Sequence, residues 1–213
     1  MSAPQRRRSD APKSPARMRK ADRKRQLLTQ AKQLFVTLGY HDTTTEKIAR
    51  AAGVSEPMLY RHFESKKALF LEVLHEIRAA TLNRWHTETA GVTDPLAKLH
   101  AIADTYLSTT REHALEFRIM HRTLMETDDE EIVAFLRSFY LDSEALLAAV
   151  ISEGQQTGVF RRSLDPRVGA WELIRTALGY TLTLPLGIPL YQEADYIPRA
   201  IECLLHCLLK TDV

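Results

Sequence analysis

The chain has 213 residues, of which 45% are hydrophobic, and a formal net charge of +2. This composition is typical of a folded protein with a sizeable core, in one large or two small domains. The basic N-terminus lacks the apolar segment of a signal peptide, and the longest uncharged run, residues 176–192, is interrupted by two glycines and two prolines. A membrane helix needs roughly 20 predominantly apolar residues, so a cytoplasmic protein without a membrane span is expected.

The charge is unevenly distributed along the chain. Residues 1–25 carry ten Lys and Arg against two Asp, a balance of +8 that leaves −6 for the rest of the chain. With prolines at positions 4, 12 and 15, residues 1–22 are predicted to be a disordered arm. Such an arm either contacts a polyanion or is only a soluble tail.

Apolar residues recur at three- and four-residue spacing nearly throughout the chain, which predicts an all-α fold. The first predicted helix covers residues 23–38, and Gly39 is placed to end it. The second covers residues 45–52, with Thr43 or Thr44 as its N-cap. These two segments open the predicted helical N-terminal head.

A tight turn separates the second predicted helix from the third. Gly53 allows a positive φ at low cost, and Ser55 is a natural N-cap for a helix over residues 56–62. Two helices this short are marginal alone, so the first helix and a fourth, over residues 66–89 after Ser65, must hold them in place. The pattern is that of a helix-turn-helix in a three-helix head.

The rest of the chain predicts a larger helical body. Acidic residues and Asp-Pro pairs mark where its helices begin. The predicted helices cover residues 95–111, 114–126, 128–156, 165–184 and 195–210.

The segment GYHDTTTEKIARAAGVSEPMLYRHFESKKALF, residues 39–70, resembles the DNA-binding domain of the TetR family of transcriptional regulators. The matching elements are Gly39-Tyr40, the threonines before Ile48-Ala49, Ala52-Gly53-Val54-Ser55, Leu59-Tyr60, His62-Phe63, Lys66 and Leu69. The resemblance implies a helix-turn-helix DNA-binding domain at residues 23–68. It further implies a helical ligand-binding and dimerisation domain at residues 69–213.

Residues of the second and third helices are candidates for contact with double-stranded DNA. If Met58, Leu59 and Phe63 face inward, the opposite side of the third helix is free for base edges and phosphates. By resemblance, Tyr60 and His62 contact phosphates, and Lys66 does so by its charge. The predicted DNA-contacting residues are Thr44, Thr45, Lys47, Ser55, Glu56, Pro57, Tyr60, Arg61, His62 and Lys66.

Three of these candidates have alternative interpretations. Glu56 either accepts a hydrogen bond from cytosine N4 or serves only as a first-turn helix acid. Arg61 binds a guanine or a phosphate, or is simply solvated. Tyr60 is otherwise a core tyrosine. The basic arm would lie beside the same duplex, where it would track phosphates or enter the minor groove.

The resemblance implies a homodimer through the last two helices, bound to a palindromic operator. The last helix supports this interpretation because it has more apolar residues than one core face needs: Ile197, Ala200, Ile201, Leu204, Leu205, Leu208 and Leu209. The alternative is that both helices are ordinary buried helices of a monomer.

Aromatic residues of the body predict a largely apolar pocket for a small-molecule effector, although the same residues would also serve as a plain core. His121 is the most plausible polar anchor, while Arg118 and Arg122 would pair with an acidic effector or with Glu126. The candidate ligand-binding residues are Trp85, Tyr106, Phe117, Met120, His121, Phe139 and Trp171, with Tyr140 and Tyr180 in the same aromatic set.

Catalysis, metal binding and a cofactor are not expected. The sequence contains no HExxH, P-loop or GxGxxG motif, and GVSEP at residue 53 lacks the second glycine of a nucleophile elbow. Cys203, Cys207 and His206 lie on one helical segment and cannot surround an ion, although a redox role stays open. The predicted function is a ligand-released repressor; an activator and a nonspecific DNA-binding or scaffolding protein are the alternatives.

Overall fold

The computed structural model describes residues 20–112, 114–193 and 195–206. Almost all of the predicted basic arm lies outside this part of the chain. So do Cys207, Leu208 and Leu209, together with the side chain of Ile197.

The described residues form helices and no β-strand, which confirms the all-α prediction. Among them, no helix is both apolar enough and long enough to cross a bilayer. The helices in chain order are α1 (Lys20–Asp42), α2 (Thr45–Ala51), α3 (Glu56–Tyr60), α4 (Lys66–Thr89), α5 (Pro95–Glu112), α6 (Ala114–Glu126), α7 (Glu130–Gln156), α8 (Pro166–Thr183), the 3-10 helices η1 (Leu184–Leu186) and η2 (Pro189–Gln192), and α9 (Tyr196–His206).

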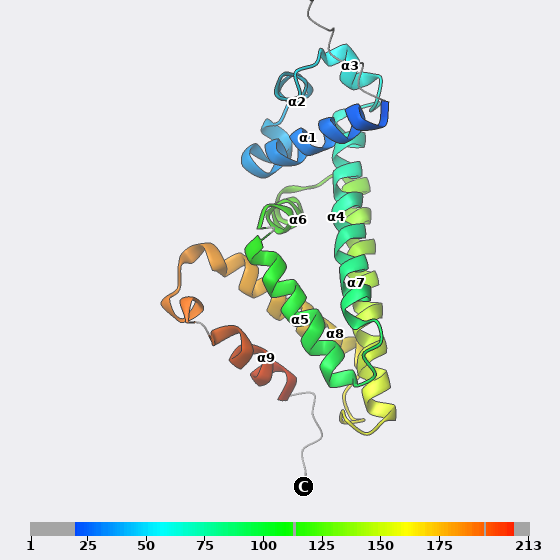
Figure 1. Ribbon diagram of the computed structural model, residues 1–213, viewed down its shortest axis with the longest axis vertical. Helices are drawn as coiled ribbons and strands as arrows, with labels where there is room; N and C mark the ends of the chain where they lie inside the picture. The colour runs from blue at the N-terminus through cyan, green and yellow to red at the C-terminus, as the bar shows by residue number, and fades with distance from the viewer. Residues whose placement is uncertain (1–19, 113, 194, 207–213) are drawn as a thin grey trace, which may run out of the picture.

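The molecule is elongated, with the head at one end (Figure 1). Helices α1, α2 and α3 form this head, and α4 leads from it along the long axis beside α7. Helix α6 packs beneath α1, while α5 and α8 run obliquely along the body. Helix α9 packs against α5 at the end of the described chain.

The junction between α1 and α2 is set by Gly39 and two threonines. Gly39 has φ 83 and ψ 175, which breaks the helical backbone at the position predicted to end the first helix. Thr43 is buried, and its hydroxyl donates to the Gly39 carbonyl oxygen over 2.6 Å. Thr44 is the N-cap of α2, since its side chain accepts from the Lys47 backbone N–H. Of the two predicted caps, Thr44 is correct.

Side-chain caps begin the longer helices near the predicted positions. The Ser65 hydroxyl accepts from the Ala68 backbone N–H over 3.0 Å at the start of α4. Asp94, Asp129 and Asp165 cap α5, α7 and α8 in the same way. Because Asp129 is itself the cap, α7 begins at Glu130, two residues later than predicted.

Helix α8 ends close to the prediction, and a turn region follows it. Pro185 has no backbone N–H to donate, and Gly187 adopts a left-handed conformation with φ 63. The chain therefore continues as η1 and η2 before α9 begins. These two short 3-10 helices were not predicted.

Two hydrophobic cores follow one another along the molecule. The first joins α1, α2 and α3 to the first half of α4, to α6 and to the first half of α7. The second joins the end of α4 to α5, the second half of α7, α8 and α9. The side chain of Tyr140 packs against both. The first core thus crosses the expected domain boundary at residue 68, so the head and α6 are packed as one body.

Candidate DNA-binding and effector-binding sites

The turn between α2 and α3 presents one side of α3 to solvent. Gly53 has φ 65, and Ile48 and Leu59 are fully buried beneath the turn. Phe63 is also buried, whereas Met58, predicted to face inward, is only half-buried. Among the candidate DNA contacts on the opposite side, Ser55, Pro57, Tyr60 and Arg61 are exposed. This is the orientation that a helix needs in order to enter a major groove.

Thr45, Glu56 and Tyr60 form a hydrogen-bonded group between α2 and α3. The Thr45 hydroxyl donates to Glu56 Oε1 over 2.5 Å and lies 3.2 Å from the Tyr60 hydroxyl. Since a threonine has one hydroxyl proton, Tyr60 is the donor in the second bond. Thr45 is buried, so the structure places it behind the surface, where it orients Glu56 and Tyr60.

Lys66 ties the end of α1 to the start of α4. Its Nζ donates to the carbonyl oxygens of Tyr40 at 2.9 Å and His41 at 3.4 Å, and it lies 4.4 Å from the centre of the Tyr40 ring. Burial lowers the pKa of Lys66, an effect that nearby Asp42 opposes. Its bonding capacity is thus already largely used within the protein.

The N-terminal turn of α2 offers two exposed candidates. Thr44 is exposed while its side-chain oxygen caps the helix. Lys47 is exposed, and its Nζ donates to the Asp42 carbonyl oxygen over 2.8 Å. Both lie where a phosphate approaching the free N–H groups of α2 would meet them.

Positive charges gather around His62, just after α3. Burial lowers the pKa of His62, followed by the charges of Lys20, Arg61, Lys24 and Arg23. Its Nδ1 is buried without a hydrogen-bond partner among the described residues. The start of α1, which continues from the basic N-terminal segment, therefore lies beside the exposed helix α3 and adds positive potential there.

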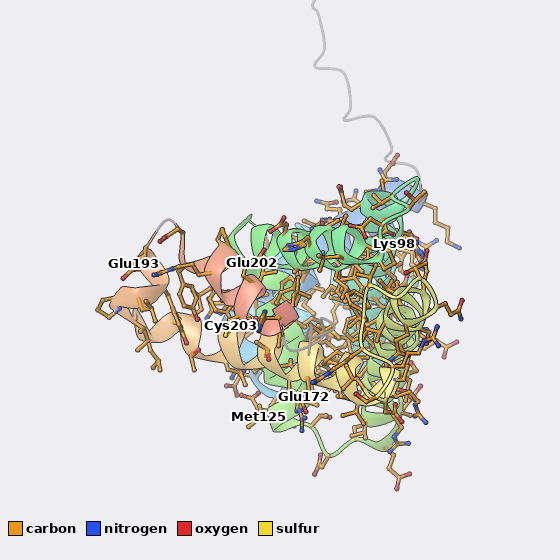
Figure 2. The ribbon with its side chains drawn as sticks, turned by 90° about the horizontal axis from the view of Figure 1, so that it is seen from below. Lys98, Met125, Glu172, Glu193, Glu202 and Cys203 are labelled. Atoms are coloured by element: carbon orange, nitrogen blue, oxygen red, sulfur yellow. The ribbon has the colours of Figure 1, made fainter. Side chains whose placement is uncertain are left out.

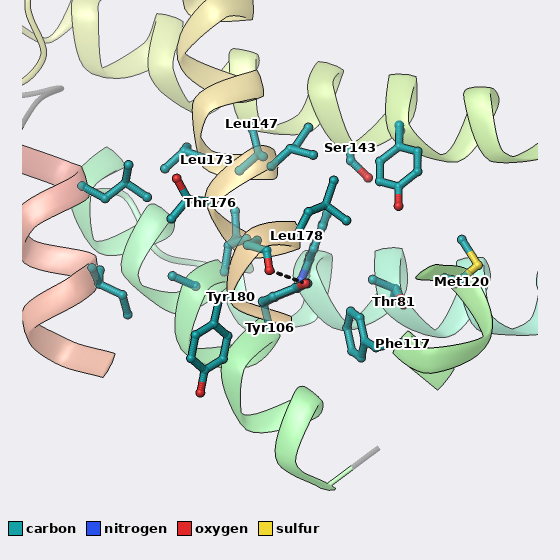
Figure 3. A pocket seen from close by; sticks show the side chains of 18 of the residues that line it. Thr81, Tyr106, Phe117, Met120, Ser143, Leu147, Leu173, Thr176, Leu178 and Tyr180 are labelled. Carbon is teal, nitrogen blue, oxygen red and sulfur yellow. Dashed lines mark hydrogen bonds between the residues drawn. The ribbon is translucent and has the colours of Figure 1, made fainter. Parts of the chain in front are cut away.

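A cavity of about 170 Å³ lies in the body, between the two cores (Figure 3). Labelled side chains from α4, α5, α6, α7 and α8 surround it, among them Thr81, Tyr106, Phe117, Ser143 and Leu173. Of the predicted ligand-binding residues, the structure brings together Trp85, Tyr106, Phe117, Met120, His121 and Phe139, and Tyr140 and Tyr180 line the same space.

Trp171 does not line the cavity. Its indole Nε1 donates to Glu144 Oε2 over 2.8 Å, and its ring lies near that of Tyr140. The sequence could not distinguish Trp171 from the other aromatic candidates for the cavity wall. Which neighbour its face of α8 meets depends on how the helices pack together.

Several aliphatic lining residues were not predicted. Ile77 comes from α4, Leu99 and Ile102 from α5, and Leu147 from α7. Their helical spacing showed only that they lie on the apolar face of a helix. The sequence did not indicate whether such a residue lines a cavity or packs in a core.

Most polar groups of the cavity wall are uncharged at neutral pH. The Tyr106 hydroxyl bonds to the Ala177 carbonyl oxygen at 3.1 Å and to Thr181 Oγ1 at 2.6 Å, and burial raises its pKa. Burial also raises the pKa of Tyr140 to about 12 and lowers the pKa of His121. The predicted polar anchor, His121, is thus a neutral imidazole.

Helix α6 connects this cavity with the head. Glu116, Phe117, Met120 and His121 line the cavity. Glu116 also pairs with Lys32 of α1, with Nζ 2.7 Å from Oε1. One helix thus lines the cavity and also contacts α1, the helix that supports α2 and α3.

The next turn of α6 approaches the end of α1. A Cβ on Gly39 would lie 2.5 Å from the Arg122 Cζ, so the guanidinium covers this glycine. Arg122 Nε donates to Glu126 over 2.7 Å. Of the two partners predicted for Arg122, an acidic effector or Glu126, the structure shows Glu126.

Comparison with known proteins identifies the head. Residues 27–73 match the family described as bacterial regulatory proteins, tetR family. The sequence is 27% identical over 168 residues to the transcriptional repressor KstR2 of Rhodococcus jostii, an alignment that covers 73% of this chain and 80% of KstR2. The DNA-binding head therefore belongs to the TetR family of transcriptional regulators.

Two further proteins are similar to this chain, one in sequence and one in fold. The transcriptional activator FasR of Mycolicibacterium smegmatis is 32% identical over 104 residues, which is 49% of this chain and 48%, about half, of FasR. A transcriptional regulator from Saccharomonospora viridis, solved in complex with choline, superposes with a TM-score of 0.79 at 23% identity, over 90% of this chain and 100% of that one. These TetR-family relatives and structural neighbours are transcriptional regulators and not enzymes, in agreement with the prediction.

Exposed apolar side chains lie on α6 and α7, where Met125 and Leu141 are examples, and at α8 and beyond it. Val168 and Leu182 are each 52% exposed on α8, and Leu186 is 69% exposed in η1. The described part of α9 instead exposes polar residues such as Glu202, which Figure 2 shows with Cys203 on the outside of the molecule. The apolar surplus predicted for the last helix is therefore not found in its described part.

Of the two cysteines, one lies among the described residues. Cys203 is exposed on α9, and Cys207 lies outside the described residues. Within the part of the chain that can be placed, no three His, Cys, Asp or Glu side chains form a group able to hold a metal ion.

Proposed function

We propose that this protein is a repressor that binds a palindromic operator as a homodimer and leaves it when a small, largely apolar effector occupies the cavity. One observation carries the proposal. The cavity lies where the two cores meet, and its walls include α4 and α6, the helices that pack against α1. Any change in these walls therefore acts on the support of the DNA-binding head.

In this proposal the candidate DNA contacts divide into two groups. Ser55, Pro57, Tyr60 and Arg61 are exposed and would meet bases and phosphates directly, with Thr44 and Lys47 at the start of α2 and His62 after α3. Thr45 and Lys66 would act by position, since the first orients Glu56 and Tyr60 and the second holds α1 against α4. Glu56 keeps a free carboxylate oxygen and stays a candidate for cytosine.

A homodimer would place two such heads on successive major grooves, roughly 34 Å apart. The exposed apolar residues on α8 and η1 support a dimer interface that begins at α8, with α9 completing it. In this proposal residues 23–68 bind DNA, while residues 69–213 bind the effector and the partner. The boundary at residue 68 then separates two functions but not two hydrophobic cores.

Effector and operator would oppose each other through one coupling free energy, typically about 1–3 kcal/mol. An occupant that moves α6 or α4 shifts α1 with it, because they share the first core. The distance between the two heads changes, and the dimer no longer fits the operator spacing. By linkage, the operator must weaken effector binding by the same factor.

The first experiment is selection of binding sites from a randomised duplex pool with the purified full chain, at fixed near-physiological salt. A recovered palindrome supports a dimeric, sequence-specific regulator. Salt-sensitive binding without any consensus contradicts it and favours a nonspecific DNA-binding protein.

In vitro transcription from a promoter carrying the recovered site separates repressor from activator. Repression without effector and recovery with effector is the expected result. Stimulation of transcription by the bound protein would contradict the repressor proposal. The protein would then be an activator, which is how FasR is described.

A further inference from the structure

The cavity has one formal charge among its described lining residues. Glu116 is acidic, and no lysine or arginine lines the wall alongside it. His121 is held neutral by burial. An ionised carboxylate is costly on an otherwise apolar wall unless a cation pairs with it, and within the protein that cation is Lys32 of α1.

The surroundings of this carboxylate favour a cation. Phe117 follows Glu116 on α6, and its ring centre lies 4.8 Å from that of Tyr106. Trp85 and Tyr140 line the same space. Aromatic faces attract an ammonium group within about 6 Å of the ring centre, and more strongly when water is excluded. An anion would face the Glu116 charge with no described cation on the wall to offset it.

We propose that the effector is an amphiphile with an apolar body and one cationic amine, and that Glu116 binds this amine. The proposal rests on the function proposed above and names its effector class. The apolar body fills the cavity between the two cores, and the ammonium group donates to the Glu116 carboxylate at the α6 side.

Binding of the amine reaches the head through Lys32. This residue lies on α1 and is joined to Glu116 across 84 positions of sequence by the 2.7 Å contact. Both side chains are partly shielded from water, with exposed fractions of 25% for Lys32 and 18% for Glu116. An ammonium group arriving from the cavity competes with Lys32 for the same carboxylate. The link between α6 and α1 weakens, and the head is freed to move.

Three probes with the same skeleton test the proposal: 4-phenylbutylamine, 4-phenylbutanol and 4-phenylbutyrate. Calorimetric titration of the full-length protein is expected to show the amine binding roughly tenfold more tightly than the alcohol, with the carboxylate weakest. Equal affinities for amine and alcohol, tighter binding of the carboxylate, or no binding of any probe would overturn the proposal.

Glu116→Gln and its matched control assign the preference to one carboxylate. Glu116→Gln should bring the amine and the alcohol to about the same affinity. Glu126→Gln removes another ion-paired carboxylate of α6, one that does not line the cavity, and should keep the preference. If Glu126→Gln loses the preference as well, the assignment to Glu116 is wrong. If Glu116→Gln does not fold, the ranking of the three probes on the unmodified protein decides.

Lys32→Gln tests the transmission step. With the selected operator duplex, saturating amine should lower operator affinity several-fold in the unmodified protein. In Lys32→Gln the amine should bind with its preference intact and change operator affinity far less. A full response in this variant excludes the Lys32 route.

The two proposals fail in different ways. An amine that binds selectively without changing operator affinity disproves the effector-controlled regulator and leaves the cation site standing. An alcohol that binds as tightly as the amine and releases the operator disproves the cation site alone.

Discussion

The head and the body of this protein differ in how tightly their helices are packed. In the head, two short helices are fully packed against their neighbours, with Ile48 and Leu59 inaccessible to solvent. In the body, long helices stand apart enough to leave a cavity of about 170 Å³. A close-packed unit moves as a whole, whereas walls around a hollow can adjust to an occupant. In the proposed function, this difference lets one chain combine a rigid DNA-reading surface with an effector site that can adjust its shape.

Leu59→Ala is expected to have the largest effect, because the head has no space that could absorb the loss. The side chain is fully buried in the first core, so the free energy of unfolding should fall by about 2–5 kcal/mol. Urea unfolding followed by circular dichroism measures this. A loss of less than about 1 kcal/mol would show that the head is loosely packed, and the contrast with the body would fail.

Gly39→Ala tests the contact between the head and α6. An alanine at φ 83 and ψ 175 is strained by roughly 1–3 kcal/mol, and its Cβ would also displace the Arg122 guanidinium. Gly158→Ala is the control, since it shares a positive φ of 79 but has open space at its Cβ. Thermal unfolding should show a larger loss for Gly39→Ala, with weakened operator binding in that variant only. Equal losses and unchanged operator binding would mean that Arg122 plays no part in holding α6 to the head.

Arg61→Ala tests whether operator affinity can be lowered without changing the free energy of unfolding. Arg61 is exposed, so its removal should change the free energy of unfolding by less than about 0.5 kcal/mol. Operator affinity should fall roughly tenfold, and a phosphate contact would also reduce the salt slope by about 1. Fluorescence anisotropy at several salt concentrations measures both. Arg162→Ala, exposed beyond the far end of α7, should leave DNA binding unchanged; an equal effect of both variants would point to net charge alone.

The smallest expected effect is a pH dependence that comes from the cavity wall. Burial lowers the pKa of His121 from 6.5 in the unfolded chain. Below about pH 6.5 the unfolded chain therefore binds the proton more readily, and the free energy of unfolding declines as pH falls, by at most about 1.4 kcal/mol per pH unit. Above that pH this contribution is complete.

His121→Gln should reduce this decline without removing it, because His62 in the head also has a lowered pKa. Urea unfolding of both proteins at pH 5.5 and pH 7.5 measures the difference. An unchanged pH dependence in the variant would show that His121 is not held neutral by the fold.

Local sequence was sufficient for the head, because its determinants are close together in the chain. Gly39, Thr44 and Gly53 act on their own backbone, and Leu59 faces inward because of the helical period. Local sequence did not reveal the partners that a side chain has within the protein. Thr45 and Lys66 were predicted to meet phosphates, and the structure adds that Thr45 bonds to Glu56 and Lys66 to carbonyl oxygens of α1.

By itself, the sequence determined the all-α fold, the position of nearly every helix, the family and the exposed side of α3, since caps, glycines and apolar periodicity act over a few residues. Only the tertiary structure decided that the two cores meet around a cavity, that Trp171 points away from it, and that Glu116 faces both this cavity and Lys32. Those features depend on how helices far apart in the chain pack together, and the periodicity of a helix specifies which face is apolar but not what that face will meet.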